Sequence, residues 1–346
     1  GQAIMGNRGW YRGVSARKDA APTIAALEND MTTLDTAWAV LAAWKPQRLA
    51  DLVHDGGEDR IAHMVRHVAD IRFDFTKTHL DDAAIAALSA IAEAGDYAGR
   101  RRALFAGEVA NPTEGRAAEH TAERGEGAAE SVLRAQQFHQ RMRLLIDAIE
   151  AGAFGEIRHL LHIGIGGSAL GPDLLIDALG RRSDRYDVAV VSNVDGAALQ
   201  AVFNRFDPAT TLVAIASKTF TTTETMLNAA SALQWLEEGG VADPFGRVVA
   251  LTAFPDKAVA WGVDETRVLP FSESVGGRYS LWSSIGFPAA LALGWDAFAE
   301  MLEGAAEMDR HVRLTDGTDN VALLAAFVDQ LYANRLGCQT RALFAY

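Results

Sequence analysis

The sequence is poor in cysteine and in positive charge, and it lacks long apolar runs; each shortage excludes a class of protein. Cys338 is the single cysteine in 346 residues, so no internal disulfide framework is possible and a reducing cytoplasm is the expected location. Acidic residues outnumber basic ones by 45 to 32, giving a formal charge of −13, which disfavours nucleic acid and anionic lipid as partners. No apolar run reaches the ~18 residues of a membrane-spanning helix, so we expect no membrane partner.

What is present is typical of a soluble globular protein, with 49% hydrophobic and 22% charged residues. The opening stretch GQAIMGNRGWYRG lacks the apolar core of a secretory signal, and it begins at Gly rather than Met, which indicates processing, a fusion or a fragment. The first 18 or so residues match no pattern. Residues 20–105 have apolar positions at helical spacing and predict a helical region. The polar stretch 111–130 predicts an exposed loop before a long helix.

Beyond residue 153, short apolar runs alternate with helical segments. Runs of this length without polar alternation suit strands buried on both faces. The pattern predicts an α/β fold with a doubly wound, mostly parallel sheet. The strand–helix pairs are HLLHIGIG with GPDLLIDALG, YDVAVVSNVD with GAALQAVFNRF, TTLVAIASK with TTETMLNAASALQWLEEG, and RVVALTAF with DKAVAWG.

The sheet is expected to be inserted in a second, largely helical domain. The chain becomes helical again after residue 280, so the two helical regions are predicted to pack together. We place the amino-terminal helical part of the larger domain at 1–119, the sheet-bearing domain at 120–290 and the return into the larger domain at 291–346. The return stops at TRALFAY without a turn or cap motif, so we expect the larger domain to be incomplete here.

The first candidate site is GIGGSALGP at residues 164–172, directly after a predicted strand and opening a predicted helix. Glycine lets the backbone approach a ligand, and a helix N-terminus offers free N–H groups and a positive dipole end. Ala169 stands where the dinucleotide fingerprint needs its third glycine, and no Gly-Lys-Ser/Thr follows as in a Walker loop. The motif therefore favours a phosphate, although a tight turn without a ligand would explain the same glycines.

The second candidate site is SKTFTTTET at residues 217–225, again between a strand and a helix. Thr221 and Glu224 fit a capping box, which is a structural explanation for part of this pattern. It does not explain Ser217, Lys218 and Thr219, which precede the cap and should lie at the carboxyl end of the strand, where open α/β sheets bind ligands. Two such loops could close on one phosphate.

The third candidate site is SVGGRYSLWSSIG at residues 274–286, where paired glycines precede Arg278. An arginine beside a phosphate site could hold the anion or stabilise developing negative charge; alone it would be an ordinary surface residue. Two other features carry less weight. His63 and His67 have a metal-compatible spacing on a predicted helix but no third ligand nearby, so we expect no metal. Cys338 lies in a helical Leu/Ala context that predicts burial and inertness.

Together and in this order, the three motifs resemble the glucose-6-phosphate isomerase family. GIGGSALGP and SKTFTTTET are similar to the two phosphate loops of its sugar-isomerase domain, and GGRYSLWSSIG matches a segment by which the family is recognised. FDFTK and RRALFAGEVANPTEGRAAEH resemble segments of its amino-terminal helical region. The resemblance covers about residues 40 to 346 and implies a cytoplasmic isomerase of glycolysis and gluconeogenesis, without cofactor or metal, that is a homodimer at full length.

The resemblance also implies roles for individual residues. The positions expected at the sugar-phosphate site are Gly167, Ser168 and Ala169. Those expected to bind the phosphate itself are Ser217, Lys218, Thr219, Thr221 and Thr222. Gly277 and Arg278 would lie over the reacting carbons. The family interconverts an aldose and a ketose phosphate through an enediolate, which needs a base to move a proton and a cation to stabilise oxygen charge; Arg278 resembles that cation.

The sequence departs from the family pattern in one respect. The catalytic glutamate, the ring-opening histidine and a late lysine of the family lie beyond the point that Tyr346 matches, and no histidine follows His311. We therefore expect sugar-phosphate binding but negligible turnover from these 346 residues. Three alternatives stay open: a non-catalytic sugar-phosphate sensor of the same fold, an isomerase of both glucose and mannose phosphates, and a dehydrogenase. The charge disfavours a DNA-reading sensor, and Ala169 disfavours a dehydrogenase.

Overall fold

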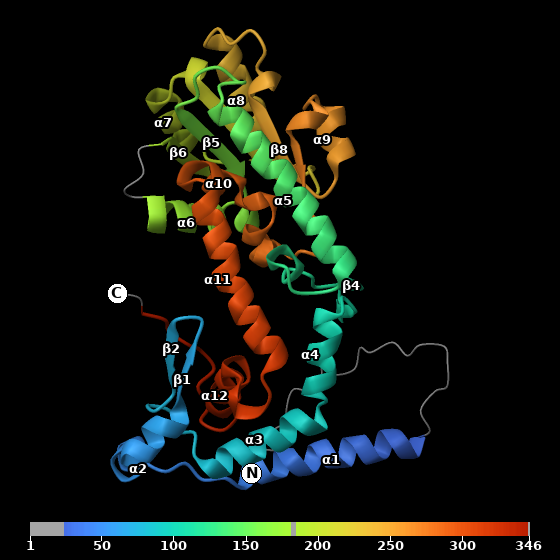
Figure 1. Cartoon of the computed structure of the whole chain (residues 1–346), viewed down its shortest axis with the longest axis vertical. Helices are drawn as coiled ribbons and strands as arrows, with labels where there is room; N and C mark the ends of the chain where they lie inside the picture. The colour runs from blue at the N-terminus through green and yellow to red at the C-terminus, as the bar shows by residue number, and fades with distance from the viewer. Residues whose placement is uncertain (1–23, 181–184, 345–346) are drawn as a thin grey trace. The chain divides into compact units, whose positions relative to one another are not determined.

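The computed structural model describes residues 24–180 and 185–344 (Figure 1). The first 23 residues and the last two, on which our expectations about the chain ends rest, lie outside the described residues. The chain forms two compact units. The first, called the sheet unit, comprises residues 105–108 and 117–306. The second, called the helical unit, comprises the described residues of 1–104, 109–116 and 307–346.

The sheet unit contains, within the described residues, a five-stranded sheet of order β6-β5-β7-β8-β9. All four pairings are parallel, which confirms the predicted α/β fold with a mostly parallel sheet. The four predicted strands are all present, and β9 is an additional one at the edge that ends at Pro270, where a missing N–H costs no sheet hydrogen bond. The strands are β5 (His159–Gly164), β6 (Asp187–Val191), β7 (Thr211–Ala216), β8 (Val248–Thr252) and β9 (Val268–Pro270).

Helices cover both faces of this sheet, and successive strand residues alternate between two cores. Leu160 and Leu212 belong to a core shared with α5 and α10, whereas Leu161 and Val213 belong to a core shared with α7, α8 and α9. Helix α6 packs against α10. The helices are α5 (Ala129–Glu150), α6 (Leu170–Gly180), α7 (Gly196–Arg205), α8 (Thr223–Glu238), α9 (Pro255–Trp261), α10 (Phe287–Leu293) and the first part of α11 (Trp295–Leu314), whose residues from 307 on belong to the helical unit.

The helical unit has its own core, to which distant parts of the sequence contribute. Leu41, Leu88 and Phe327 are buried together in it, so that α1, α3 and α12 share one apolar centre. Its elements are α1 (Ile24–Ala43), α2 (Leu49–Met64), β1 (Val65–Val68), β2 (Ile71–Asp74), α3 (Asp82–Ala94), α4 (Tyr97–Phe105), β3 (Val109–Asn111), β4 (Arg116–Ala117) and α12 (Val321–Asn334). Among the described residues, no helix has both the length and the apolar character that a membrane crossing requires.

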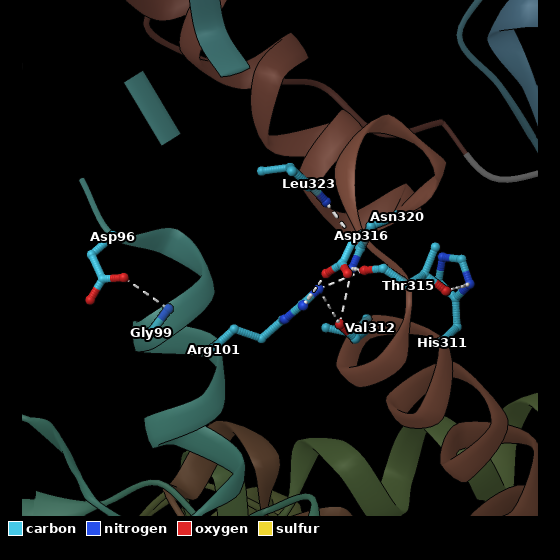
Figure 2. A network of polar contacts seen from close by, with 9 residues as sticks. All are labelled: Asp96, Gly99, Arg101, His311, Val312, Thr315, Asp316, Asn320 and Leu323. Carbon is cyan, nitrogen blue, oxygen red and sulfur yellow. Dashed lines mark hydrogen bonds and ion pairs between the residues drawn. The ribbon is translucent and has the colours of Figure 1, made fainter. Parts of the chain in front are cut away.

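A polar network fastens α4 to the turn before α12 in the helical unit (Figure 2). Arg101 donates hydrogen bonds to the carbonyl oxygens of Val312 and Thr315 at 3.3 and 2.6 Å. The amide of Asn320 donates to the same two oxygens, at 2.9 and 3.0 Å. The Asn320 side-chain oxygen caps α12 by accepting from the backbone N–H groups that begin the helix. The network therefore couples the cap of α12 to the guanidinium of Arg101.

The prediction that residues 20–105 are helical is wrong at one place. Residues 65–74 form a β-hairpin, β1–β2, in which Val68 pairs with Ile71. Ala69 and Asp70 form its two-residue turn with φ of 49° and 59°. Such turns usually contain Asn or Gly, which adopt positive φ easily. Because Ala69 and Asp70 lack that pattern, the hairpin could not be recognised from the sequence.

The prediction of an exposed loop at residues 111–130 is correct for residues 112–115, which are exposed, and wrong for residues 121–123, which are buried. Glu123 is 4% exposed, although the segment contains little apolar periodicity. Its carboxylate lies 3.2 Å from Nε2 of the buried side chain of His139 on α5, and the same nitrogen is 2.8 Å from the carbonyl oxygen of Trp282. The backbone N–H of Glu119 donates to the carbonyl of Ser274 at 3.0 Å. Polar residues are therefore buried in this segment, which a hydrophobicity pattern does not reveal.

Two weaker predictions also need correction. Cys338 is exposed, not buried, because α12 ends at Asn334 and the chain turns at Gly337 with a φ of 73°. His63 and His67 do not share a helix: His63 lies in the last turn of α2, whereas His67 lies on β1. Nδ1 of His63 bonds to the carbonyl of Asp59 at 2.7 Å, and this histidine is exposed on the surface of α2.

Candidate functional site

The loops 164–172 and 217–225 leave neighbouring strands at the same edge of the sheet. β5 and β7 are parallel, and Gly164 pairs with Ala216 at their carboxyl ends. The chain passes from β5 to β6 on one side and then crosses back to β7 on the other, so the strand order reverses at β5. Ligands of open α/β sheets bind at the carboxyl edge where this reversal occurs. The two loops therefore flank the position that the topology favours for a ligand.

The first loop forms a short 3-10 turn, η2 (Gly166–Ser168), before α6 begins. Gly166 has a φ of 57°, a conformation that favours glycine. The N–H of Ala169 closes the turn by donating to the carbonyl of Gly166 at 3.0 Å. Ala169 is 0% exposed, so its methyl group and its backbone are both covered by the surrounding protein. Ser168 is half-buried, and its hydroxyl lies on the loop just ahead of the positive end of α6.

The second loop brings several hydroxyl groups together directly after β7. Ser217 is buried, and its Oγ lies 3.0 Å from Oγ1 of Thr222. Thr221 donates a hydrogen bond to the hydroxyl of Thr219 at 2.9 Å, and both side chains are exposed. Phe220 lies between them with a φ of 51°, which is rare for a bulky residue. Its buried ring packs into the sheet core, so the loop backbone is held in a strained but fixed conformation.

The expected capping box of Thr221 and Glu224 is not formed. Helix α8 begins at Thr223, and its N-cap is Thr222, whose side chain makes no cap hydrogen bond. The Thr222 hydroxyl is instead paired with Ser217. The structural explanation that the sequence offered for Thr221 and Glu224 is therefore wrong. The hydroxyls of this loop face one another rather than the helix backbone.

Lys218 connects the second loop to the third segment. Its Nζ donates to the carbonyl oxygens of Glu273 and Val275, the latter at 3.1 Å. Val275 is buried and directly precedes Gly276 and Gly277. The ammonium of Lys218 is thus bonded to the backbone of the third segment, and it adds positive charge at the carboxyl edge of the sheet.

The third segment packs directly on the first loop. The 3-10 helix η6 (Gly277–Trp282) approaches η2 so closely that a methyl group on Gly167 would lie 2.0 Å from the carbonyl oxygen of Gly277. The hydroxyl of Ser280 bonds to the carbonyl oxygens of Gly167 and Gly277 at 3.1 and 2.7 Å. The structure therefore brings the three sequence motifs together, although they are separated by tens of residues.

Arg278 follows Gly277 and is exposed. In the described part of the chain, its guanidinium has no hydrogen-bond or ion-pair partner that would neutralise it. Tyr279, the next residue, stacks on the ring of His120 with centroids 4.6 Å apart. An exposed, unneutralised arginine beside two glycine-rich turns provides a cation for an anionic ligand.

Sequence reasoning missed two residues of this constellation, His162 and Ser280. His162 lies inside β5, and its Nε2 is 2.6 Å from the carbonyl oxygen of Ser168 in the first loop. Burial lowers the pKa of His162 from 6.5 to about 4, so the imidazole is neutral near pH 7. A histidine in an apolar strand gave no hint of this contact. Ser280 lies within the third motif, but only the fold shows that its hydroxyl joins two glycines.

A family model decides where this fold and these motifs belong. The model described as phosphoglucose isomerase matches residues 74–346. The chain belongs to the phosphoglucose isomerase family. The match includes all three motifs, so the family resemblance on which their interpretation rests is confirmed.

Relatives in the phosphoglucose isomerase family support the same conclusion. The glucose-6-phosphate isomerase of Sphingopyxis alaskensis is 74% identical over 316 residues, which are 91% of this chain and 63% of the relative. That of Zymomonas mobilis is 59% identical over 313 residues, 90% of this chain and 62% of the relative. The crystal structure of a glucose-6-phosphate isomerase from Chlamydia trachomatis superposes with a TM-score of 0.75 at 25% identity, covering 89% of this chain and 60% of that one. The chain thus spans less than two thirds of the length of these relatives.

Proposed function

We propose that the chain provides the sugar-phosphate site of a glucose-6-phosphate isomerase, which interconverts D-glucose 6-phosphate and D-fructose 6-phosphate. The observation that carries this proposal is the convergence of the three motifs at the carboxyl edge of the parallel sheet, with Gly167 against Gly277 and Lys218 bonded to Val275. The family match and the names of the relatives support the choice of substrate. We further propose that these residues belong to one sugar-isomerase domain, residues 120–290.

In this proposal the anion is bound mainly by backbone and hydroxyl donors. The loop N–H groups at the start of α6, together with Ser168, Ser217, Thr219, Thr221 and Thr222, supply neutral donors that a phosphate accepts. Lys218 and Arg278 supply the local positive charge that must overcome a net charge of −13. A backbone site suits this task because its dipoles are already oriented before the ligand arrives.

The proposed reaction needs two kinds of chemical group. A base moves a proton between the two reacting carbons, and a cation stabilises the enediolate oxygens. Arg278 is the residue that we propose for the cation. We infer that these 346 residues hold no counterpart of the glutamate, histidine and lysine that the family resemblance implies for the other steps. We therefore expect the chain alone to bind a sugar phosphate without turning it over.

Calorimetric titration of the chain with glucose 6-phosphate tests the proposal, with glucose and inorganic phosphate as reference ligands. We expect glucose 6-phosphate to bind and glucose to bind at least about tenfold more weakly, because the phosphate supplies most contacts. Thr222→Val removes one expected phosphate donor while keeping the side-chain shape, and Thr266→Val, at an exposed hydroxyl of the sheet unit, is the matched control. Equal affinity for glucose and glucose 6-phosphate would contradict a phosphate site.

A coupled assay for fructose 6-phosphate tests the expectation about turnover. Activity of the chain well above that of a lysate control would show that catalysis needs nothing further. Binding without turnover agrees with the proposal that these residues bind the sugar phosphate but do not isomerise it. The alternative, a non-catalytic sugar-phosphate sensor of the same fold, would be favoured if a chain of the relatives' full length also bound the sugar phosphate without isomerising it.

A further inference from the structure

His162 occupies a position where the fold itself has no use for a polar side chain. It lies in the interior of β5, paired in register with Val190 and Ala214 on the two neighbouring strands, and it is 0% exposed. Leu160, two residues earlier on the same face, belongs to the apolar core between the sheet and α5. An aliphatic side chain at 162 would serve that core without the cost of burying a polar ring.

The single described partner of His162 defines its tautomer. Nε2 lies 2.6 Å from the carbonyl oxygen of Ser168, which can only accept, so Nε2 carries the proton. Nδ1 is then an acceptor, and it is buried without a partner in the described part of the chain. Because burial holds the pKa near 4, the ring stays neutral and this arrangement persists at neutral pH. His162 therefore keeps one hydrogen bond to the loop, through Nε2, while its Nδ1 stays buried without a partner in the described part of the chain.

That bond holds the carbonyl of Ser168 against the end of β5. Gly164 approaches the same oxygen from the strand: a methyl group there would lie 2.6 Å from it. The carbonyl is therefore enclosed between His162 and Gly164, turned into the protein and away from the loop surface. A carbonyl oxygen that faced outward would repel an anion at the N–H groups of the loop. Its inward orientation leaves the donors of the loop as the groups that an anion meets.

We propose that His162 is a positioning residue of the phosphate site, which fixes the loop 164–172 through the Ser168 carbonyl and thereby sets the affinity for the phosphate group. This inference rests on the proposed sugar-phosphate function. His162 does not touch the ligand; it acts through the backbone of Ser168. A leucine at position 162 would suit the apolar core equally well, but it has no N–H group. The Ser168 carbonyl would then lose its only described side-chain hydrogen bond.

Three variants test the role of the Nε2–H donor. His162→Leu fills the space without a donor, whereas His162→Gln places an amide N–H close to the position of Nε2. Gly164→Ala displaces the Ser168 carbonyl from the other side. We expect His162→Leu and Gly164→Ala to weaken glucose 6-phosphate binding at least about tenfold in calorimetric titrations, and His162→Gln to return most of the affinity. Rescue by glutamine is the result that core packing alone would not produce.

The outcomes separate this inference from the proposed function. If the wild-type chain binds no sugar phosphate, the proposed function fails, and with it the inference. If the wild type binds and folded His162→Leu binds equally well, the proposed function stands and His162 is not a positioning residue. Should His162→Leu fail to fold, ¹⁵N-histidine NMR of the wild type decides. A protonated Nε2 whose resonance shifts when glucose 6-phosphate is added supports the inference, and a proton on Nδ1 overturns it.

Discussion

Gly167 and Gly277 meet backbone to backbone: a methyl group on Gly167 would lie 2.0 Å from the carbonyl oxygen of Gly277 and 2.3 Å from its carbonyl carbon. Neither atom belongs to a flexible side chain that could move aside. The two glycines come from different motifs, one after β5 and the other opening η6. Their contact is what makes two separate loops into one surface, so it is the feature of the site most sensitive to a single added carbon.

Gly167→Ala should therefore separate the first loop from the third segment. We expect glucose 6-phosphate affinity to fall at least about tenfold, and the free energy of unfolding to fall by about 1–3 kcal/mol, the usual cost of overpacking. Gly304→Ala is the matched control, because Gly304 lies in α11 with nothing within 4 Å of the added methyl. That control should gain about 0.5–1 kcal/mol from helix propensity and keep its affinity. Undiminished binding by Gly167→Ala would show that the contact does not shape the site.

Ser280→Ala should weaken the same contact without adding volume. Ser280 is 2% exposed, and its hydroxyl lies 3.1 Å from the carbonyl of Gly167 and 2.7 Å from that of Gly277. Removing it should cost about 1–2 kcal/mol in the free energy of unfolding, measured by urea titration, and lower the phosphate affinity as well. Ser231→Ala removes an exposed hydroxyl that bonds within α8 and should change neither quantity measurably. A variant at 280 that matched the 231 control would contradict this role.

The elements of the sheet could be predicted because their causes are local. Buried parallel strands are short apolar runs, and stretches rich in glycine or hydroxyl residues mark the turns that follow β5 and β7. Residues 164–172 and 217–225 were therefore assigned to the correct ends of the correct strands. The hairpin at 65–74 could not be recognised, because Ala69 and Asp70 adopt the left-handed turn conformation without the glycine that usually marks it.

The contacts that join the motifs could not be predicted from the sequence, because they are tertiary. Nothing near Lys218 indicates that its ammonium bonds to the carbonyl of Val275, 57 residues later. The roles of His162 and Ser280 depend in the same way on which backbone oxygens the fold brings to them. The motifs thus indicate which residues the site contains, whereas the hydrogen bonds that hold the loops in place depend on the fold. The assignment of individual residues to the phosphate stays a prediction.

The buried imidazole of His162 predicts a loss of stability in mild acid. Its pKa is lowered by burial from 6.5 to about 4, so between these values the unfolded chain binds a proton that the folded chain does not. The free energy of unfolding therefore has its full value above pH 6.5. It decreases as the pH falls toward 4, by roughly 3 kcal/mol in total. Urea unfolding of the wild type and of His162→Leu across this range should show a loss in the wild type that the variant lacks, with His54→Gln, an exposed histidine, following the wild type. Parallel profiles for wild type and His162→Leu would contradict the assignment.

In the helical unit, we expect Arg101 to stabilise the start of α12 (Figure 2). Its side chain is 10% exposed, and its guanidinium bonds to the carbonyls of Val312 and Thr315 and to the carboxylate of Asp316. Arg101→Met keeps the apolar stem but removes every donor. We expect the free energy that protects the first amides of α12 against hydrogen exchange to fall by about 1.5–3 kcal/mol, the usual range for hydrogen bonds from a charged group.

Amide hydrogen exchange locates this effect better than global unfolding, because a chain of two units need not unfold in a single step. The amide N–H groups of Ala322 and Leu323 donate to the side-chain oxygen of Asn320, whose own amide shares both carbonyl partners with Arg101. These amides should therefore exchange faster in Arg101→Met, while those of β5 in the sheet unit keep their protection. Arg102→Met, at the exposed neighbouring position, should leave both sets unchanged. Unaltered exchange at Ala322 and Leu323 in the Arg101 variant would mean that Asn320 holds the turn by itself.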